Sequence, residues 1–219
     1  MRKWSIAIFV AVFAFYYLTS SREPAWGDAH GMWEVADRVV QHASIDIKTR
    51  WPEDLPPGRN GKIYSINPIG VSVVHMPGAA FAAVSHIVAP KQDPLLRPIF
   101  THLGPSLLGA LTCVLFFGLL VDLGRTRRTA SLATAILAVS TTLWVYARMP
   151  YSEVMQLTCF LGLFRQTLRV ANASTRKNAI WLGVWAGCLF NAKYVFALAI
   201  VGALALLVWV LRKRARVLV

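Results

Sequence analysis

The chain has 219 residues, 56% of them hydrophobic and only 15% charged, and its mean hydropathy is +0.52. A water-soluble domain is usually nearer to half apolar and a quarter charged, so the composition argues against an ordinary soluble domain. The formal net charge of +13 would suit nucleic acid, but the basic residues lie in short segments between apolar runs. That placement favours a membrane protein and argues against nucleic acid as a partner.

Long apolar runs nearly free of charge follow one another along the chain. They are Trp4–Thr19, Pro98–Leu123, Thr129–Ala147, Glu153–Val170 and Ala179–Leu211. A helix needs about 20 apolar residues to cross a bilayer, so the last run is too long for one straight crossing. It predicts two helices with a break near Asn191–Tyr194. The expected fold is an all-α integral membrane protein of about five to six transmembrane helices, the first in residues 1–20 and the rest in residues 99–219.

The first run begins after Arg2 and Lys3, as a signal peptide would. However, Tyr16, Tyr17 and Leu18 stand where a cleavage site needs small residues, so we expect an uncleaved anchor. The cysteines all lie within apolar runs without a C-x-x-C partner, and they indicate small buried hydrophobes rather than disulfides or metal ligands. They are Cys113, Cys159 and Cys188.

The charge distribution predicts the topology. Basic residues cluster at 2–3, 125–128, 169–177 and 212–216, with Asp122 as the only acid nearby, whereas residues 21–98 hold eight acids and eight bases. Because arginine and lysine concentrate in cytoplasmic segments, the N-terminus is expected in the cytoplasm and residues 21–98 outside the plasma membrane. Arg165, in the last turns of its helix, is expected to reach the inner headgroups.

Two helices are expected inside this outer loop. Met32–Ile45 has apolar residues at i, i+3 and i+4 spacing, which suits a helix lying on the membrane surface. Val71–Val88 predicts a second interfacial or re-entrant helix. The loop tryptophans fit the interfacial preference of that side chain. They are Trp26, Trp33 and Trp51.

The order of several features resembles the N-terminal half of GT-C-fold glycosyltransferases, which include protein O-mannosyltransferases and the enzyme that adds aminoarabinose to lipid A. The features are Gly27-Asp28-Ala29-His30 before the amphipathic helix, Tyr64-Ser65-Ile66-Asn67-Pro68, the turn Met149-Pro150-Tyr151-Ser152-Glu153, and the short helix Gly183–Lys193. The resemblance implies transfer of a sugar from a polyprenyl-phosphate donor on the outer face. Family members are commonly at least twice this length, so a fragment or a reduced version is expected. Asn67 stands where some members carry a lysine.

Asp28 is the candidate catalytic base, because inverting transfer needs a carboxylate to take the acceptor's proton. Its alternative role is the N-cap of the helix that follows, and Glu23 is the competing acid. The residues expected to bind donor or acceptor are Tyr64, Asn67, Arg148, Glu153 and Lys193. Lys193 is expected to face the carrier phosphate, with membrane snorkelling as its alternative role. No metal site is assigned, although Asp28 and His30 could together bind a divalent ion.

Two other functions remain open. A non-catalytic scaffold or assembly partner would keep this arrangement without transfer. A transporter or channel would need polar breaks deep in several helices, which the runs from Pro98 to Ala147 lack. Membrane lipids are expected partners in every case.

Overall fold

The computed structural model describes residues 2–22, 27–48 and 57–217, and it is helical almost throughout. Its helices are α1 (Arg2–Leu18), α2 (Asp28–His42), α3 (Ile69–Val88), α4 (Asp93–Thr101), α5 (Leu103–Asp122), α6 (Arg127–Val139), α7 (Leu143–Tyr146), α8 (Glu153–Asn172), α9 (Arg176–Ala192) and α10 (Ala197–Val217). Short 3-10 turns, η1 (Arg59–Gly61) and η2 (Tyr194–Phe196), and a two-stranded hairpin, β1 (Asp46–Ile47) with β2 (Ile63–Tyr64), complete the described part. The predicted all-α class is confirmed.

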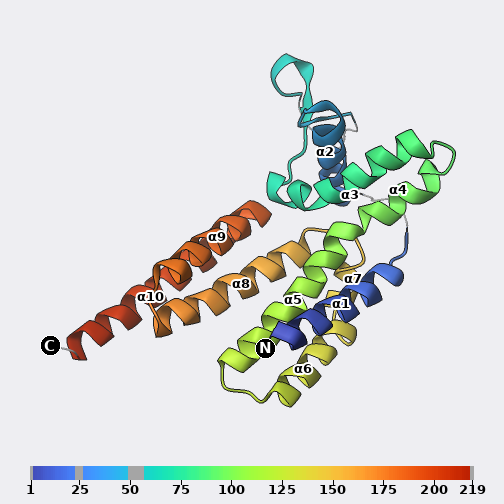
Figure 1. Cartoon of the computed structure of the whole chain (residues 1–219). Helices are drawn as coiled ribbons and strands as arrows, with labels where there is room; N and C mark the ends of the chain where they lie inside the picture. Colours follow the sequence, from blue (N-terminus) through green and yellow to red (C-terminus); the bar gives the residue numbers. More distant parts are fainter. Residues whose placement is uncertain (1, 23–26, 49–56, 218–219) are drawn as a thin grey trace.

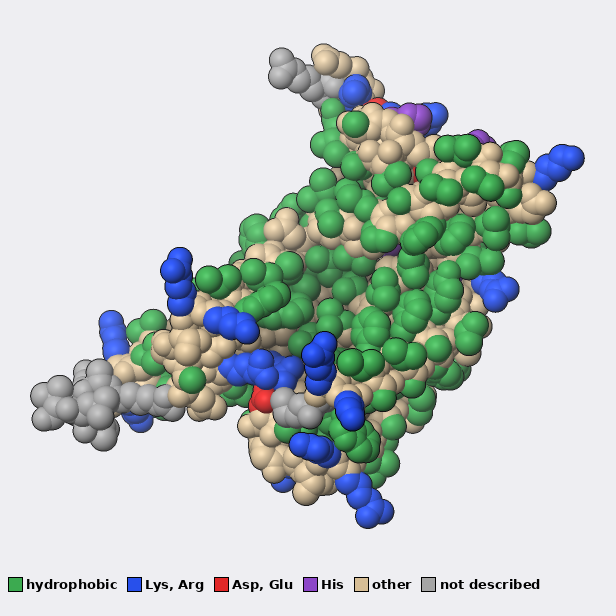
Figure 2. Space-filling model, viewed as in Figure 1, with side chains coloured by type: hydrophobic (Ala, Val, Ile, Leu, Met, Phe, Trp, Pro, Cys, Tyr) green, Lys and Arg blue, Asp and Glu red, His purple; other side chains and the backbone are tan. Residues whose placement is uncertain are grey.

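The long helices lie side by side, and α2, α3, α4 and the hairpin gather at one end of the bundle (Figure 1). We call this the loop end. The opposite end, where α5 finishes and α6 starts, is the basic end. Lys and Arg side chains crowd around it in Figure 2. The segments predicted to be cytoplasmic are thus collected at a single end of the molecule.

Contacts between helices give the direction of each one. The Thr158 hydroxyl donates to the Leu108 carbonyl oxygen near the loop end, and Arg169 binds Asp122 at the basic end, so α5 and α8 are parallel. Gln166 in α8 donates to Asn178 in α9, while Gly162 packs against Trp185, so α8 and α9 are antiparallel.

The last apolar run reverses as predicted. Lys193 has an extended backbone (φ −165°, ψ 125°) after α9, and η2 leads into α10. The Phe160 and Phe196 rings lie 6.4 Å apart, and further along Thr167 and Leu206 line one groove, so α10 runs parallel to α8. The predicted break near Asn191–Tyr194 is confirmed.

Two other boundaries differ from expectation. Pro98–Leu123 was expected as one helix. In the structure the helical segment begins at Asp93, and His102 separates it into α4 and α5. Thr129–Ala147 is interrupted after Val139, and α7 is a separate turn of helix. Ser and Thr hydroxyls that bond to backbone oxygens bend or end helices, and Thr141 donates to the Leu137 carbonyl oxygen at 2.7 Å in this break.

In the described part of the chain, three helical segments are long and apolar enough to cross a membrane. They are Ile69–Val88, Asp93–Asp122 and Tyr194–Lys213. Their surfaces fit lipid better than water: Leu198 is 78% exposed and Val201 62%, whereas α3 turns Ser72 and Ser85 inward. Large apolar side chains outside and small or polar ones inside form the pattern of helices that pack within a bilayer.

The bundle is held by small residues and buried hydroxyls. The Thr112 and Thr158 hydroxyl oxygens lie 2.6 Å apart between α5 and α8, and both side chains are fully buried. Gly109 lets α5 approach Tyr16, whose hydroxyl donates to the Ala138 carbonyl oxygen at 2.9 Å. In lipid, such close packing and interhelical hydrogen bonds replace the hydrophobic drive of a water-soluble core.

Replacing Thr112 and Thr158 with valine, singly and together, should give a coupling free energy of about 0.6 kcal/mol and no more than about 1.7 kcal/mol. The reason is that each valine keeps the shape of threonine, and the cycle cancels the bonds that each hydroxyl makes to backbone oxygens, which leaves the energy of the hydroxyl pair. A parallel cycle pairs Thr134→Val with Thr158→Val, because the Thr134 hydroxyl bonds to the Ala130 carbonyl oxygen within α6. The two effects should add within about 0.5 kcal/mol. Unfolding in mixed micelles measures both cycles. Equal coupling in the two would show that the Thr112–Thr158 contact has no energetic role.

At the basic end, Arg165, which was expected to reach the inner headgroups, pairs with Asp122. Its Nε donates to the Asp122 carboxylate at 2.7 Å, and Arg169 donates to the same oxygen at 3.0 Å. Gly118 leaves the space for this arginine, because a Cβ there would lie 2.3 Å from the guanidinium carbon. Asp122 ends α5 one turn beyond Gly118, so its carboxylate lies within hydrogen-bond distance of this guanidinium.

Candidate functional site

Helix α3 forms the floor of the loop end. Its backbone closely crosses the end of α4 and the start of α5: a Cβ at Gly78 would lie 2.3 Å from the Phe100 carbonyl oxygen, and one at Gly104 would lie 2.6 Å from that of Val74. At its other end, Gly70 touches α9, where a Cβ would lie 2.6 Å from the Asn191 carbonyl oxygen. Helix α3 therefore lies across the ends of α5 and α9.

Helix α2 covers α3, and this corrects the expected surface helix. It spans Asp28–His42 rather than Met32–Ile45, and Met32, Val35 and Ala36 are buried. Trp33 is only 7% exposed, and its ring meets His75 edge-on at 6.0 Å. The apolar face thus binds the partner helix instead of lipid, because α3 offers a complementary small-residue face. Trp26 and Trp51 lie outside the described residues.

Asp28 is the first residue of α2, and its side chain is exposed. The N-cap position is taken by Gly27, whose φ of 57° suits a residue without a Cβ, and Asp28 makes no capping hydrogen bond. The alternative role as N-cap is therefore wrong. A carboxylate in the first turn gains from the helix dipole and keeps its oxygens available. Glu23, the competing acid, lies outside the described residues.

His30 is turned toward Glu34, with 3.7 Å between Nε2 and the carboxylate. Glu34 also accepts a hydrogen bond from the Lys48 backbone N–H at 2.6 Å. In the described ranges, no group of three or more His, Cys, Asp or Glu side chains could hold a metal ion. Within those ranges the structure therefore completes no metal site around Asp28 and His30.

Tyr64 and Asn67 belong to the segment that joins the hairpin to α3. Tyr64 lies in β2 opposite Asp46, and the Asn67 backbone N–H donates to the Ser65 hydroxyl at 3.2 Å. That hydroxyl also faces α2, because a Cβ at Gly31 would lie 3.5 Å from it. Since Gly31 is one turn after Asp28, the segment passes beside the start of α2.

Lys193 comes to the same end from α9. It is exposed, and it follows Asn191, which touches Gly70 in the first turn of α3. Asn67 lies just before that turn. The N-terminal end of α3 is thus the place where the segments of Asp28, Asn67 and Lys193 converge.

Arg148 and Glu153 flank the turn between α7 and α8. The Arg148 guanidinium donates to the Thr19 carbonyl oxygen and lies 4.4 Å from the centre of the Trp144 ring. It therefore fastens α7 to the end of α1. Glu153 is exposed at the start of α8, and no described contact joins it to Asp28 or Lys193.

A buried histidine pair was not foreseen. His75 and His102 are far apart in the sequence, yet each is only 1% exposed. The Pro150 carbonyl faces the His75 ring, but the two do not form a hydrogen bond of normal geometry. The pair fills the junction of α3, α5 and the turn before α8. The periodic polar and small residues of α3, which are Ser72, His75, Gly78, Ala79 and Ala82, were the signal that this face is buried.

The hairpin depends on Asp46. Its carboxylate accepts hydrogen bonds from the Ser44 hydroxyl and from Arg38 Nη2 at 2.9 Å, with Lys62 Nζ at 3.8 Å. The Ser44 bond first, and then Arg38, lower the pKa of Asp46 to about 2. Because the folded pKa lies below the unfolded value, this carboxylate stabilises the hairpin above about pH 4, and the contribution is lost as pH falls toward 2.

Acidification from pH 5 to pH 2 should therefore speed hydrogen exchange at Ile47 and Ile63, relative to the intrinsic rate, more than at α5 amides. Replacing Asp46 with asparagine should remove most of this difference, because the side chain no longer titrates. Exchange mass spectrometry measures both proteins. The same acid sensitivity in the variant would contradict the role given to Asp46.

No protein-family description matches the chain, no curated protein is significantly similar to it, and no solved structure resembles it significantly, so its site is defined by its own residues alone.

Proposed function

We propose that the chain is a membrane glycosyltransferase of the GT-C kind, or a portion of one, that acts at the loop end. The observation that supports this proposal is that the segments carrying Asp28, Asn67 and Lys193 meet around the first turn of α3. These residues come from three distant segments and combine a carboxylate, an amide and a cation. The opposite end of the bundle holds the surplus arginine and lysine.

The proposal includes a topology. Six helices cross the plasma membrane, namely α1, α5, α6 with α7, α8, α9 and α10, and α3 lies at the outer surface over their ends. The alternating directions of these helices and the single basic end support it. Helix α3 is long enough to cross on its own, but its close contacts with the starts of α5 and the end of α9 favour a surface position.

The chemistry assigns one role to each residue. Asp28 takes the proton from an acceptor hydroxyl, whose oxygen bonds to the anomeric carbon as the bond from that carbon to the phosphate oxygen breaks. The polyprenyl phosphate leaves with the bonding electrons. Lys193 faces that phosphate and offsets its growing negative charge, while Asn67 and Tyr64 orient the sugar. Glu153 is proposed to orient the acceptor, and Arg148 to line the donor site while it holds α1.

The purified full reading frame, reconstituted in vesicles with polyprenyl-phosphate-linked radioactive sugars, tests the proposal. Transfer to an extracted envelope glycan, lipid or protein fraction is the expected result. No transfer from any donor, with a folded protein verified by thermal unfolding, would contradict it.

A non-catalytic scaffold is the second candidate. Three acids of the outer segment are occupied by internal ion pairs: Asp37 with Arg97 at 3.2 Å, Asp93 with the same arginine at 3.6 Å, and Asp46 with Arg38. If these acids serve only to form ion pairs within the outer segment, the function of that segment is to bind a partner protein. Co-purification of one membrane enzyme in fixed ratio, together with absence of transfer by the chain alone, would select this function.

A further inference from the structure

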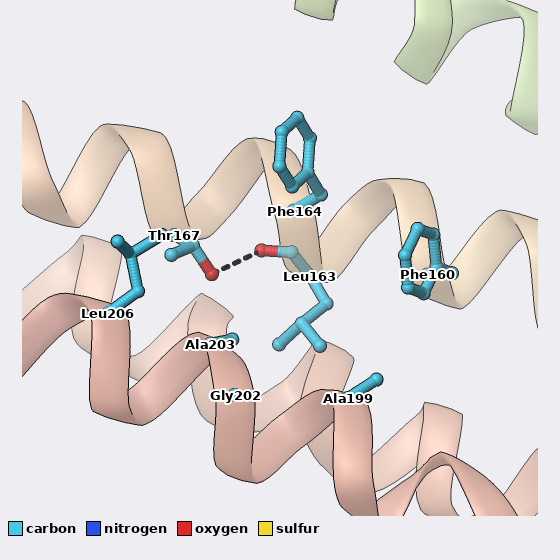
Figure 3. Close-up of a pocket in the computed structure, with 8 residues that line it drawn as sticks. All are labelled: Phe160, Leu163, Phe164, Thr167, Ala199, Gly202, Ala203 and Leu206. Atoms are coloured by element: carbon cyan, nitrogen blue, oxygen red, sulfur yellow. Dashed lines mark hydrogen bonds between the residues drawn. The ribbon is translucent and has the colours of Figure 1, made fainter.

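A groove opens between the middle of α8 and the first half of α10 (Figure 3). Its volume is about 250 Å³. Leu163 and Thr167 line it from α8, and small residues of α10, among them Ala199, Gly202 and Ala203, leave the space open. A Cβ added at Gly202 would meet nothing within 4 Å.

The lining of the groove offers its occupant no free hydrogen-bonding side chain. Thr167 is the one side chain of its lining with a hydroxyl, and that hydroxyl already donates to the Leu163 carbonyl oxygen at 2.8 Å. All other lining side chains are hydrocarbon. The occupant is therefore hydrocarbon as well, because a polar group would lose its hydrogen bonds here.

The charge of the basic end decides between a lipid and a second copy of the chain. The lining runs from Ala199 to Leu206, about 10 Å along α10. A second copy in the same orientation would bring another basic end beside the first, so repulsion between like charges disfavours it as the occupant. An anionic lipid brings the opposite charge.

The groove leads toward cations at the basic end. Lys213 follows Leu206 by two helical turns on the same face of α10, and its Nζ lies 4.2 Å from the centre of the Trp209 ring. A lysine above a tryptophan marks headgroup depth. Among the described residues, the acid at this end is Asp122, which Arg165 and Arg169 already bind. An anionic headgroup from outside the protein would therefore find Lys213 free of any carboxylate among the described residues.

We propose that the groove between α8 and α10 holds one acyl chain of an anionic phospholipid of the inner leaflet, with its phosphate at Lys213 and Trp209. The hydrocarbon lining fixes the chain, and the cation selects the charged headgroup. Lys213 and Trp209 lie at the basic end, and the assignment to the inner leaflet rests on the proposed topology. Neither depends on the chain being a transferase.

Native mass spectrometry of the full chain, released from vesicles of equal phosphatidylglycerol and phosphatidylcholine, tests the site. The wild type should retain one phosphatidylglycerol that Gly202→Leu loses, because the leucine fills the groove. The matched control is Gly183→Leu, another open glycine outside the groove, which should keep the lipid. Lys213→Gln should weaken phosphatidylglycerol binding about fivefold and leave phosphatidylcholine unchanged, since one cation near the surface contributes about 1 kcal/mol.

Three results would overturn the inference. Equal retention of both lipids by the wild type would remove the headgroup selectivity. Retention of the same lipid by Gly202→Leu, in a protein that unfolds at the wild-type temperature, would remove the groove. Loss of a dimer rather than of a lipid in that variant would assign the groove to a second copy of the chain.

Discussion

Asp28→Asn should lower the rate of sugar transfer by at least about 100-fold, the effect expected when a positioned general base is lost. Asparagine keeps the size of the side chain and cannot accept a proton. Stability should change little, by less than about 1 kcal/mol, because Asp28 is exposed and makes no capping bond. Initial rates at saturating donor, with the unfolding temperature as a second measurement, separate the two effects.

The control is the same substitution on the same helix. Asp37→Asn removes the ion pair with Arg97 and should lower stability modestly, while transfer stays within about twofold. If Asp28→Asn kept full activity, Asp28 would have no part in the reaction. If both variants lost activity equally, the loss would report on the integrity of α2 rather than on a base.

Gly104→Leu should destabilise the chain by about 3 kcal/mol or more and abolish transfer. Gly104 lies in the first turn of α5, where a Cβ would be 2.6 Å from the Val74 carbonyl oxygen. Backbone atoms cannot yield as the tip of a side chain can, so α3 must move away from α5. The floor that positions Asn67 would then be lost together with the packing.

Gly187→Leu is the matched control, because Gly187 lies within α9 and a Cβ there meets nothing within 4 Å. It should leave stability unchanged or raise it by less than about 1 kcal/mol, since leucine is the better helix former. Unfolding in mixed micelles and the transfer assay measure both variants. Wild-type stability in Gly104→Leu would show that α3 does not lie across α5 as described.

The sequence predicted the elements that depend on composition and charge. The lengths of the apolar runs predicted the helices. The excess of positive charge in Arg125–Arg128 and at Arg176 and Lys177 predicted that these segments share one end of the bundle. The break at Lys193 followed from the length of the apolar run and from the basic residues at both of its ends. Such features are local, so a pattern in one segment is enough to predict them.

Features that depend on contacts between distant segments were missed. An amphipathic pattern such as that of α2 shows that one face is apolar, but not whether lipid or α3 covers it. The closeness of His75 and His102 arises from the crossing of α3 over α5, which two glycines permit. The hairpin strands have two residues each, too few for an alternating pattern, and the Asp46 contacts hold them.

The candidate site was foreseen only as single residues. Asp28, Asn67 and Lys193 are separated by long stretches of chain, and the first turn of α3 brings their segments together through Ser65 and Gly70. Arg148 had the right residue type for a phosphate contact, yet its guanidinium is engaged by Thr19. Sequence position could not show this, because the end of α1 is remote in the chain.

Single cysteines in place of Lys62 and Arg127, in a background with Cys113, Cys159 and Cys188 changed to alanine, give the most direct test of the whole arrangement. Both sites are exposed, one at the hairpin and one at the start of α6. A membrane-impermeant maleimide added to intact cells should label the cysteine at 62 and reach the one at 127 only after lysis. Labelling at 127 with protection at 62 would put the proposed catalytic end in the cytoplasm and contradict the account.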